Sequence, residues 1–402
     1  MRTRAVLAIN TGSSSVKFAV FAHPPHGDPD RRPLHEGEAD DGGDGMRIRY
    51  DAQPPRLLPR AAGDRGDPYC AVLAQVVAWV RDTLSHVSLS AVVHRVVHGG
   101  AHYAAPVIVD DRVLHTLRTL TPLAPLHQPH SLDAIDALRA ALPGVAQIAV
   151  FDTAFHRTLP RTEQWLPLPR AWFDKGVRRY GFHGLSYEYL GIALDEAFGA
   201  RARGRVIAAH LGSGASLCAL RELRSVATTM GFSALDGLMM GTRCGALDPG
   251  AVLHLLDEEN LTSAQLGALL YHESGLKGVS GLSSDPRVLF AREAEGDAAA
   301  RDALDLYVHR IVRETGALTA LLGGLDMLVF TAGIGEGSAA MRARICAALG
   351  WLGIALDPAA NAAHAHVISS ASSAVMVVVE PTREAWVAAR DAIRLLRGES
   401  DA

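Results

Sequence analysis

The stretch VLAINTGSSSVKFAV, from Val6 to Val20, joins two apolar, partly β-branched runs through a segment of glycine, serines and a lysine. The runs Val6–Ile9 and Val16–Val20 are typical of β-strands. The linker is too long for the tightest hairpin turn, and Gly12 lets its backbone turn. Hydroxyls and the Lys17 ammonium that converge on one point suit a phosphate oxygen. A serine-rich turn in solvent explains the same residues, so this stretch alone leaves both interpretations open.

The same pattern occurs again as VIAAHLGSGASLCAL, which starts at Val206. The two stretches align without a gap and share five of fifteen residues (Val, Ala, Gly, Ser and Ala), with Asn10 opposite His210 and Gly12 opposite Gly212. Two strand–loop–strand segments with like loops predict a duplicated protein. We expect each domain to offer one phosphate-binding hairpin to a cleft between the domains.

Length, charge and cysteine usage narrow the class of protein. The 402 residues predict two domains, each large enough to bury its own core. A formal net charge of -4 argues against nucleic acid or an anionic membrane as a partner, and there is no run of about 18 apolar residues that could span a membrane. Four widely separated cysteines without a CxxC pair favour a reducing compartment. Polar residues from Asn10 onward interrupt any signal peptide, so we expect a cytoplasmic protein.

The order of elements predicts an α/β fold. Residues 23–68 are rich in Pro, Gly, Asp and Arg, which indicates a variable surface excursion whose one strand is MRIRY. From Tyr69 onward, strand and helix patterns alternate down to the C-terminal helix EAWVAARDAIRLLRG. We expect a first domain over residues 1–151 and 386–402 and a second domain over residues 152–385.

A third loop adds to the twin hairpins as a candidate nucleotide site. The chain has no Walker A sequence, and GSGASL lacks the third glycine of the dinucleotide fingerprint. In LVFTAGIGEGSAAM, however, Gly333, Gly335 and Gly337 are expected to turn the chain from a strand at 328–330 into a helix near Ser338. Glycines let a backbone approach a ligand, and a helix N-terminus carries partial positive charge. A plain strand-to-helix turn is the alternative.

Four charged or titratable residues are candidates for chemistry. Arg95 in VVHRVVHGG and Arg243 in GTRCGALDPG have apolar or glycine-rich surroundings, where a guanidinium is costly unless it meets an anion. One arginine in each half suggests a clamp on a transferring phosphoryl group. Asp152 follows a strand in QIAVFDTAFH, and His183 lies in a glycine-flanked loop before a helix. Structural ion pairs and helix caps are the alternatives for each of them.

The histidines do not predict a transition-metal site. In HRVVHGGAH, His94, His98 and His102 are spaced by four, but the residues between them do not favour a helix. No HExxH motif or Cys/His cluster occurs, so structural or loop histidines are expected. Mg²⁺ needs few protein oxygens beside those of phosphates, and Asn10 and Glu384 could serve it through water.

The segments NTGSSSVKF, HRVVHGG, FDTAFH, RRYGFHG, TTMGF…GTRCGALDPG and FTAGIGE resemble, in order and spacing, the acetate kinase family. That family belongs with actin, sugar kinases and heat-shock ATPases. The resemblance covers nearly the whole chain except residues 23–68. It implies two duplicated actin-like (ribonuclease-H-like) domains, a homodimer, and reversible phosphoryl transfer between ATP and a short carboxylate. Mg²⁺, with Mn²⁺ as an alternative, is the implied cofactor, and an acyl phosphate and ADP are the implied products.

The resemblance also implies roles for individual residues. The catalytic residues are Arg95, Asp152, His183 and Arg243. The nucleotide-binding residues are Ser13, Ser15, Lys17, His210, Leu211, Gly212, Ser213, Gly214, Asp285, Pro286, Arg287, Gly333, Ile334, Gly335, Glu336 and Gly337. The substrate-binding residues are Arg95, Val97, Leu126, Phe182 and Ala234. The metal-binding residues are Asn10 and Glu384.

The implied reaction needs no strong general base, because a carboxylate is already ionised at neutral pH. We therefore expect direct in-line transfer without a phosphoenzyme. Ala234 replaces a proline that usually completes the apolar pocket, which leaves propionate and butyrate as alternatives to acetate. The other departures from the family pattern are Gln128, His130, Ser213, Ala227, Arg383 and Ala385. Those in the nucleotide and metal loops leave a second alternative, a catalytically weak nucleotide-binding regulatory homologue. A sugar kinase is disfavoured, because two arginines suit a charged acceptor better.

Overall fold

The computed structural model describes residues 3–12, 15–41, 46–51, 53–58, 68–83, 87–125 and 127–399. Two predicted site residues, Ser13 and Leu126, lie outside these ranges. The chain divides into two compact units, Met1–Ala154 with Arg383–Ala402, and Phe155–Thr382. Asp152 and Glu384 therefore both belong to the first unit. Within the described ranges, no helix combines the length and hydropathy that crossing a membrane requires.

The described part of the first unit is built on an eight-stranded sheet in the order β5-β4-β3-β2-β1-β6-β8-β7. Its strands are β1 (Thr3–Thr11), β2 (Ser15–Ala22), β3 (His35–Asp41), β4 (Met46–Tyr50), β5 (Arg56–Leu58), β6 (Val87–Val96), β7 (Val107–Ile108) and β8 (Ala146–Phe151). Its helices are α1 (Pro68–Thr83), α2 (Asp111–Thr119), α3 (Gln128–Ala141) and α15 (Glu384–Leu396), with a 3₁₀ turn η1 (Thr121–Leu123).

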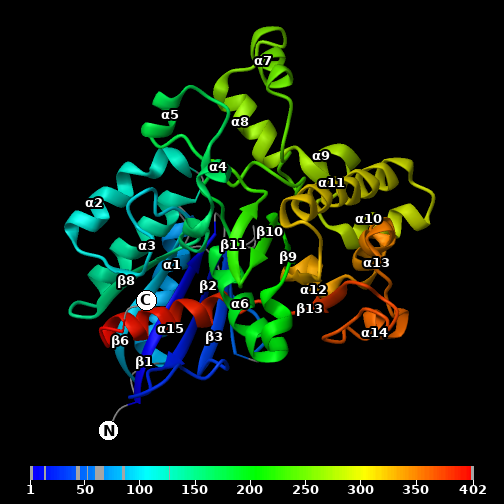
Figure 1. Ribbon diagram of the computed structural model, residues 1–402. Helices are drawn as coiled ribbons and strands as arrows, with labels where there is room; N and C mark the ends of the chain where they lie inside the picture. The colour runs from blue at the N-terminus through cyan, green and yellow to red at the C-terminus, as the bar shows by residue number, and fades with distance from the viewer. Residues whose placement is uncertain are drawn as a thin grey trace. The chain divides into compact units, whose positions relative to one another are not determined.

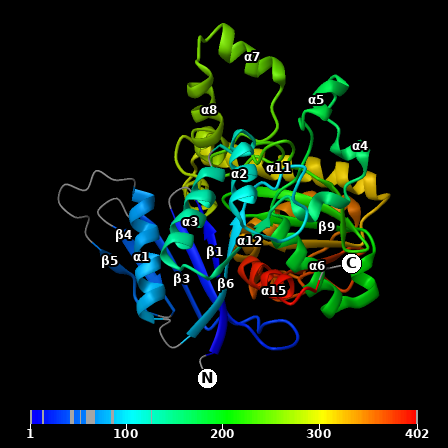
Figure 2. The ribbon, with the colours of Figure 1, turned by 90° about the vertical axis from the view of Figure 1, so that its left-hand side faces the viewer.

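Helices cover both faces of the central strands of this sheet. Leu7 and Ile9 of β1 belong to the core that the sheet shares with α1 and α3. Because successive side chains alternate between faces, Val6 and Ala8 point to the opposite face. Helix α15 packs against β1, β2, β6 and β8, and Figure 2 shows α1 and α3 on one side of β1 and β6 with α15 on the other. Burial on both faces explains why β1 is apolar over consecutive positions rather than alternate ones.

The excursion at residues 23–68 contains more strands than the sequence predicts. MRIRY forms β4 as expected, but β3 and β5 were missed. The sequence of β3, HEGEADD, has charged residues and a glycine that disfavour a strand. Pairing with β2 and β4 overrides that preference. Gly37 makes room for an aromatic ring, because a Cβ atom there would lie 2.3 Å from Cζ of Phe18.

The C-terminal helix holds the loop that precedes β3. Trp386 of α15 donates its indole N–H to the carbonyl of Pro29 at 2.9 Å. Arg394 donates to Asp28 at 3.0 Å, and Arg397 donates to the carbonyl of Gly27 at 2.7 Å. These bonds anchor α15, whose first residue is Glu384, against the first unit.

The described part of the second unit is built on a five-stranded sheet in the order β11-β10-β9-β12-β13. Its strands are β9 (Val206–Leu211), β10 (Ala215–Arg221), β11 (Arg224–Thr228), β12 (Met327–Thr331) and β13 (Met376–Val379). Its helices are α4 (Arg161–Gln164), α5 (Arg170–Asp174), α6 (Gly184–Phe198), α7 (Pro249–Asp257), α8 (Ser263–His272), α9 (Gly275–Ser280), α10 (Pro286–Ala294), α11 (Ala298–Leu322), α12 (Ala332–Gly337), α13 (Ala339–Ala348) and α14 (Pro358–Ala362). The 3₁₀ turns are η2 (Ala154–Thr158), which starts at the last residue before the unit, η3 (Gly199–Arg203) and η4 (Gly350–Leu352).

Figure 1 shows the two sheets, and their strand orders confirm the internal repeat. The order β3-β2-β1-β6-β8 in the first unit matches the order β11-β10-β9-β12-β13 in the second. In both sets the first three strands are antiparallel and the last two join in parallel. The aligned glycines also behave alike: the Gly12 N–H donates to the Ser15 carbonyl at 2.7 Å, and the Gly212 N–H to the Gly214 carbonyl at 3.0 Å. The predicted α/β class with duplicated domains is therefore correct.

The glycine-rich segment after β12 differs from its prediction. The strand predicted at 328–330 and the helix predicted near Ser338 are present as β12 and α13, but the glycines between them form a short helix, α12, instead of a turn. None of these glycines has a positive φ, whereas Ala332 at the junction has φ +64°. A Cβ atom on Gly333 or Gly337 would meet nothing within 4 Å. The sequence pattern was mistaken for a turn because glycine disfavours helices in general.

Candidate active site

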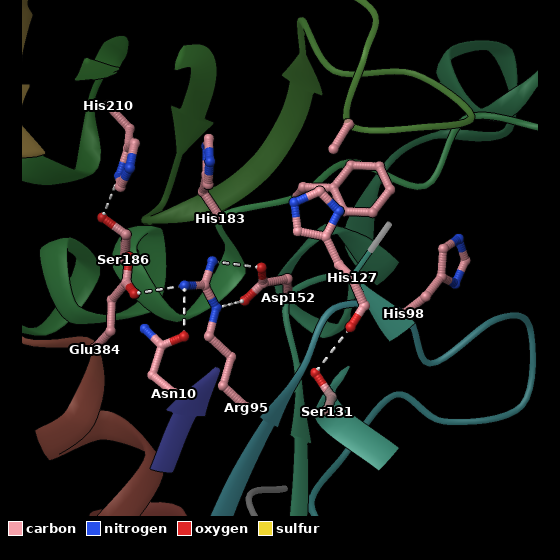
Figure 3. A network of polar contacts seen from close by, with 12 residues as sticks. Asn10, Arg95, His98, His127, Ser131, Asp152, His183, Ser186, His210 and Glu384 are labelled. Carbon is pink, nitrogen blue, oxygen red and sulfur yellow. Dashed lines mark hydrogen bonds and ion pairs between the residues drawn. The ribbon is translucent and has the colours of Figure 1, made fainter. Parts of the chain in front are cut away.

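Arg95, near the end of β6, contacts three side chains from distant parts of the first unit (Figure 3). Its Nε and Nη2 atoms donate to the two carboxylate oxygens of Asp152 at 2.8 and 2.6 Å. Its Nη1 atom donates to Asn10 Oδ1 at 3.3 Å and pairs with Glu384 Oε2 at 3.2 Å. Four residues that the sequence nominated separately therefore form one cluster, which we call the Arg95 cluster.

The strand order explains why this cluster forms. Strands β1, β6 and β8 are adjacent and parallel, so their carboxyl ends meet at one edge of the sheet. Asn10 lies near the end of β1, and Asp152 comes directly after β8. Asn10 also continues the row of Val6 and Ala8, which faces α15, and Glu384 is the first residue of that helix.

The electrostatics of the cluster favour a permanently charged arginine. Burial alone would lower the pKa of Arg95, but the nearby carboxylates of Asp152 and Glu384 outweigh burial and raise that pKa. Asp152 is only 2% exposed, so its pairing takes place largely out of water. With both acids ionised, two carboxylates face one guanidinium, and the cluster keeps one negative charge. Hydrogen bonds use three of the five guanidinium N–H donors of Arg95, one on each nitrogen.

Oxygen atoms of the Arg95 cluster fit a hard cation better than a transition metal. Nowhere in the described ranges do three or more His, Cys, Asp or Glu side chains gather in a way that could hold a metal ion. The cluster offers two carboxylates, an amide oxygen and a residual negative charge. This set suits Mg²⁺, which takes many of its ligands from phosphates and water, and it lacks the nitrogen and sulfur ligands of a typical zinc site.

The loop after β6 is held by Gln128, one of the departures from the family pattern. Gln128 is fully buried. Its Oε1 accepts the His98 N–H at 3.2 Å, and its Nε2 donates to the carbonyls of His98 and Leu117 at 3.1 and 3.3 Å. Val97, which is predicted to line the substrate pocket, is buried and precedes His98, to which Gln128 is bonded. Gln128 thus anchors the chain that follows Arg95.

Lys17 lies apart from the contacts of Arg95. Lys17 lies opposite Asn10 in the backbone register of β1 and β2. Its Nζ atom is 3.7 Å from Glu38 Oε1, and 64% of its side chain is exposed. Ser15 starts β2, and its carbonyl accepts the Gly12 N–H. The predicted roles of both residues in phosphate binding stay predictions.

His183 stands at the centre of the polar contacts in the second unit. It precedes α6 with φ 60° and ψ 26°, a left-handed conformation that costs a residue with a side chain about 1–3 kcal/mol and often marks a functional position. Its ring stacks on that of His210 with centroids 4.0 Å apart, and Figure 3 shows the two rings next to each other. Its Nδ1 atom is 2.8 Å from Ser216 Oγ, and His210 Nδ1 is 2.9 Å from Ser186 Oγ.

His156 helps to hold this strained loop. Its Nε2 lies 2.8 Å from the carbonyl of Phe182, and since a carbonyl only accepts, Nε2 carries a proton there. Its Nδ1 is 2.8 Å from Ser225 Oγ, which then donates. Burial lowers the pKa of His156 to about 4, so the ring is neutral at physiological pH. Gly181 has φ +76°, and a Cβ there would lie 2.6 Å from the His156 ring.

Gly214 keeps open a point that His183 and Arg243 both border. A Cβ atom on Gly214 would lie 3.2 Å from His183 Nε2 and 3.6 Å from Arg243 Nη1. Arg243 is itself oriented by a bond from Nη1 to the carbonyl of Ala234 at 3.0 Å. Two predicted catalytic residues and two predicted binding residues of the second unit therefore lie together.

The segments predicted to bind nucleotide adjoin this point. A Cβ on Gly212 would be 3.6 Å from Cβ of Ala332, at the start of α12. A Cβ on Gly241 would be 3.7 Å from the Ser213 carbonyl and 3.4 Å from the Cβ of Ser284. The loop at 212–214 thus lies close to both α12 and the segment before α10. Leu211 and Pro286 are buried, and Ile334 is partly buried.

Two predicted contacts with the nucleotide are engaged within the protein. Asp285 caps α10, and its Oδ2 pairs with Arg287 Nη2 at 2.6 Å. Glu336 Oε1 accepts the N–H groups of Ala332 and Thr382 at 2.7 and 3.0 Å, which ties α12 to the chain beyond β13. In this structure these carboxylates stabilise local backbone.

Nothing in the sequence singles out Arg342. It is fully buried, and it donates to the carbonyls of Gly335 and Glu336 at 2.9 and 2.6 Å and to Asn361 Oδ1 at 2.8 Å. These bonds hold the C-terminal end of α12 in place. His156, by contrast, lies in the FDTAFH motif, so the motif was a usable signal. Ser216 lies in the repeat, but nothing in the sequence linked it to His183.

Comparison with known proteins decides the family. The model of the acetokinase family matches residues 5–390. The chain belongs to the acetokinase family. Acetokinases are kinases that transfer phosphate to a carboxylate, as the sequence resemblance predicts. An acetate kinase of Methylocella silvestris is 48% identical over 400 residues, which cover 98% of each chain.

Solved structures of acetokinases and related enzymes have the same two-domain, actin-like fold. The acetate kinase of Porphyromonas gingivalis is 34% identical, with a TM-score of 0.85 over 98% of this chain and 100% of that one. A propionate kinase from Francisella tularensis is 31% identical, with a TM-score of 0.88 over 96% of this chain and 98% of that one.

Proposed function

We propose that this acetokinase catalyses the reversible transfer of the γ-phosphoryl group of ATP to acetate, with acetyl phosphate and ADP as products. The observation that carries the proposal is the Arg95 cluster, in which a charged guanidinium is held rigidly by Asp152, Asn10 and Glu384. The name shared by relatives at 48% identity supports acetate as the acceptor. We propose that the first unit contributes the Arg95 cluster and that the second unit binds the nucleotide.

The chemistry asks the protein for alignment and charge neutralisation. The acceptor carboxylate is ionised at neutral pH and attacks phosphorus directly, so no residue has to remove a proton. Arg95 has N–H donors beyond its three hydrogen bonds in the cluster, and Asp152 keeps the guanidinium in a single orientation while a remaining donor binds an anion. His183 and Arg243, which border one point, supply further donors to the equatorial oxygens of the phosphoryl group.

Mg²⁺ is the proposed cofactor, with Mn²⁺ as a substitute. When bound, it neutralises negative charge on the phosphate oxygens. Asn10 and Glu384 would hold it, directly or through water. Chelation with EDTA should abolish turnover, and added MgCl₂ or MnCl₂ should restore it.

Acetate is favoured, and propionate remains a second candidate on one specific observation. Ala234 stands where the family usually has a proline, and its carbonyl accepts a hydrogen bond from Arg243. A smaller side chain next to that arginine leaves room for an acceptor longer by a methylene. The likeness to a propionate kinase is consistent with such a pocket.

A hydroxamate assay tests the function directly. The purified chain is incubated with ATP, Mg²⁺, hydroxylamine and acetate, propionate or butyrate, and kcat/KM is compared across the three. Acetate should give the highest kcat/KM, and an Arg95→Gln variant should give a background rate. Turnover on none of the acids by a chain that still binds ATP would favour the regulatory homologue instead. Transfer to a chiral phosphoryl group should invert configuration, whereas net retention would contradict in-line transfer.

A homodimer in the cytoplasm completes the proposal. Helix α7 exposes apolar side chains: Leu253 is 59% exposed, and α7 has no buried residue. Exposed apolar patches often mark interaction sites, and a second copy is the partner that we propose for this one. Light scattering after size-exclusion chromatography should give twice the chain mass, and Leu253→Lys should shift it to one.

A further inference from the structure

A line of hydrogen-bonded hydroxyls leads from the core of the second unit to His183. Tyr187 Oη is 2.5 Å from Ser216 Oγ, and Ser216 Oγ is 2.8 Å from His183 Nδ1. Tyr187 and Ser216 are both fully buried. The Tyr187 ring packs in the core with Leu190, Leu194 and Val206. The line therefore starts on a rigid part of the unit.

The fold brings these side chains to one face. Along β9, Val206 and Ala208 face α6, and the alternation continues with His210. Ser216 of β10 pairs directly with His210, so its hydroxyl points to the same face. Tyr187 comes one helical turn after His183, and its N–H donates to the His183 carbonyl at 3.1 Å. Helix and sheet thus hold both ends of the line.

The direction of the protons along this line can be deduced. Burial raises the pKa of Tyr187 well above its usual value, so the phenol is protonated, and in the described residues its hydroxyl contacts Ser216 Oγ. The phenol therefore donates its hydrogen to Ser216. The Ser216 hydroxyl contacts Tyr187 and His183 in the described residues, so once it accepts from Tyr187 we infer that its own hydrogen is directed to His183 Nδ1. A ring nitrogen that accepts carries no proton, so the proton of a neutral His183 is on Nε2.

We propose that Tyr187 and Ser216 are positioning residues that hold His183 as the neutral tautomer with its proton on Nε2. Nε2 is the atom that lies beside Gly214 and shares that point with Arg243. The ring of His210 stacks on that of His183 with centroids 4.0 Å apart, which adds to the fixed orientation of His183. His183 then offers one oriented N–H bond to an anion and takes no proton from it. The consequence for rate rests on the proposed function, but the tautomer does not.

The tautomer is measured by NMR on the full chain labelled with ¹⁵N-histidine. Long-range ¹H–¹⁵N correlations separate protonated from unprotonated ring nitrogens, and a His183→Asn variant identifies the resonances of His183. In the wild type, Nδ1 should be unprotonated and Nε2 protonated at pH 7.5. In Ser216→Ala and Tyr187→Phe, the spectrum should shift toward a mixture of tautomers. An Nδ1–H tautomer or an imidazolium in the wild type would overturn the proposal.

Kinetics supply the second readout. Loss of one hydrogen bond that fixes the catalytic tautomer should lower kcat about 10-fold in Ser216→Ala and Tyr187→Phe, with each KM changed less than about twofold. Tyr307→Phe is the matched control, because Tyr307 is a fully buried tyrosine of the same unit whose hydroxyl has no hydrogen-bond partner in the part of the chain that the structure describes. Its kcat should match the wild type. An equal loss of kcat in Tyr307→Phe and Tyr187→Phe would overturn the proposed positioning role of Tyr187.

The two proposals fail separately. If the wild type has the expected His183 tautomer but turns over no carboxylate, the proposed function is overturned and the positioning of His183 is not. If the wild type turns over a carboxylate with the opposite tautomer, only the positioning proposal is overturned. If Ser216→Ala does not fold, Tyr187→Phe and the wild-type spectrum decide the question.

Discussion

Arg95 and Asp152 meet through two parallel hydrogen bonds of 2.8 and 2.6 Å, at the ends of the adjacent strands β6 and β8. A planar guanidinium that is bound at two points by one carboxylate cannot rotate, so its remaining donors keep fixed directions. The same carboxylate lies almost entirely out of water. The pair therefore stabilises the fold and also orients Arg95 for its proposed catalytic role. Mutations can separate these two effects.

Arg95→Lys should remove catalysis while the fold survives. Lysine keeps the positive charge but cannot bond both oxygens of Asp152 and also reach Asn10. We expect kcat/KM to fall about 10³-fold, the scale at which arginines stabilise phosphoryl transfer. Asp152→Asn, which leaves the guanidinium less well compensated, should in addition lower the free energy of unfolding by about 3 kcal/mol. Urea unfolding and the hydroxamate assay measure the two effects, and an active Arg95→Lys enzyme would contradict the assignment.

Gly214→Ala tests whether the point next to His183 and Arg243 must stay open. The new methyl group would lie 3.2 Å from His183 Nε2, so the imidazole has to move by a few tenths of an ångström. Since small misplacements of catalytic groups are costly, kcat should fall about 10-fold or more. Gly350→Ala is the control, because a Cβ there meets nothing within 4 Å and its φ is not positive. Similar rates for both variants would show that the space is not used.

Three buried histidines make stability depend on pH. Burial lowers the pKa of His94, His98 and His156 to about 4 each. In the unfolded chain these groups bind a proton near pH 6.5, so the unfolded state gains protons first as the pH falls. Stability is therefore fully present above pH 6.5 and is lost between pH 6.5 and 4. At full slope each histidine removes about 1.4 kcal/mol per pH unit from the free energy of unfolding.

Urea titrations at pH 7.5, 6.0 and 5.0 measure this dependence. His94→Gln should reduce the slope, since it removes one of these contributions. His94 is a suitable position, because its Nδ1 atom has no hydrogen-bond partner in the described ranges and its Nε2 contacts only the amide of Gln147 at 2.8 Å. An unchanged slope in this variant would mean that other groups set the acid sensitivity.

Ala234→Pro tests the origin of acceptor preference. Proline restores the usual family residue, keeps the carbonyl that binds Arg243, and narrows the space next to it. The ratio of kcat/KM for acetate to that for propionate should rise about 10-fold, which is the discrimination that one methylene allows. Both constants come from the hydroxamate assay. If kcat/KM falls by the same factor for acetate and for propionate, the acceptor pocket lies elsewhere.

Local patterns in the sequence were sufficient for much of the fold and the site. Alternating strand and helix patterns and the repeat of VLAINTGSSSVKFAV at Val206 determined the α/β class and the duplication. The order of motifs nominated Asn10, Arg95, Asp152 and Glu384 one by one. These inferences hold because strand propensity, glycine content and the end of an apolar run depend on neighbours in the chain.

Only the tertiary structure decided which side chains meet. The strand HEGEADD forms because two neighbouring strands supply its partners, against its own propensity. The two-point contact of Arg95 with Asp152, the buried Arg342 behind α12, and the hydroxyls that lead to His183 all join residues far apart in the chain. Their pairing depends on which strands lie side by side and which face each residue occupies, and the sequence states neither until the sheets are assembled.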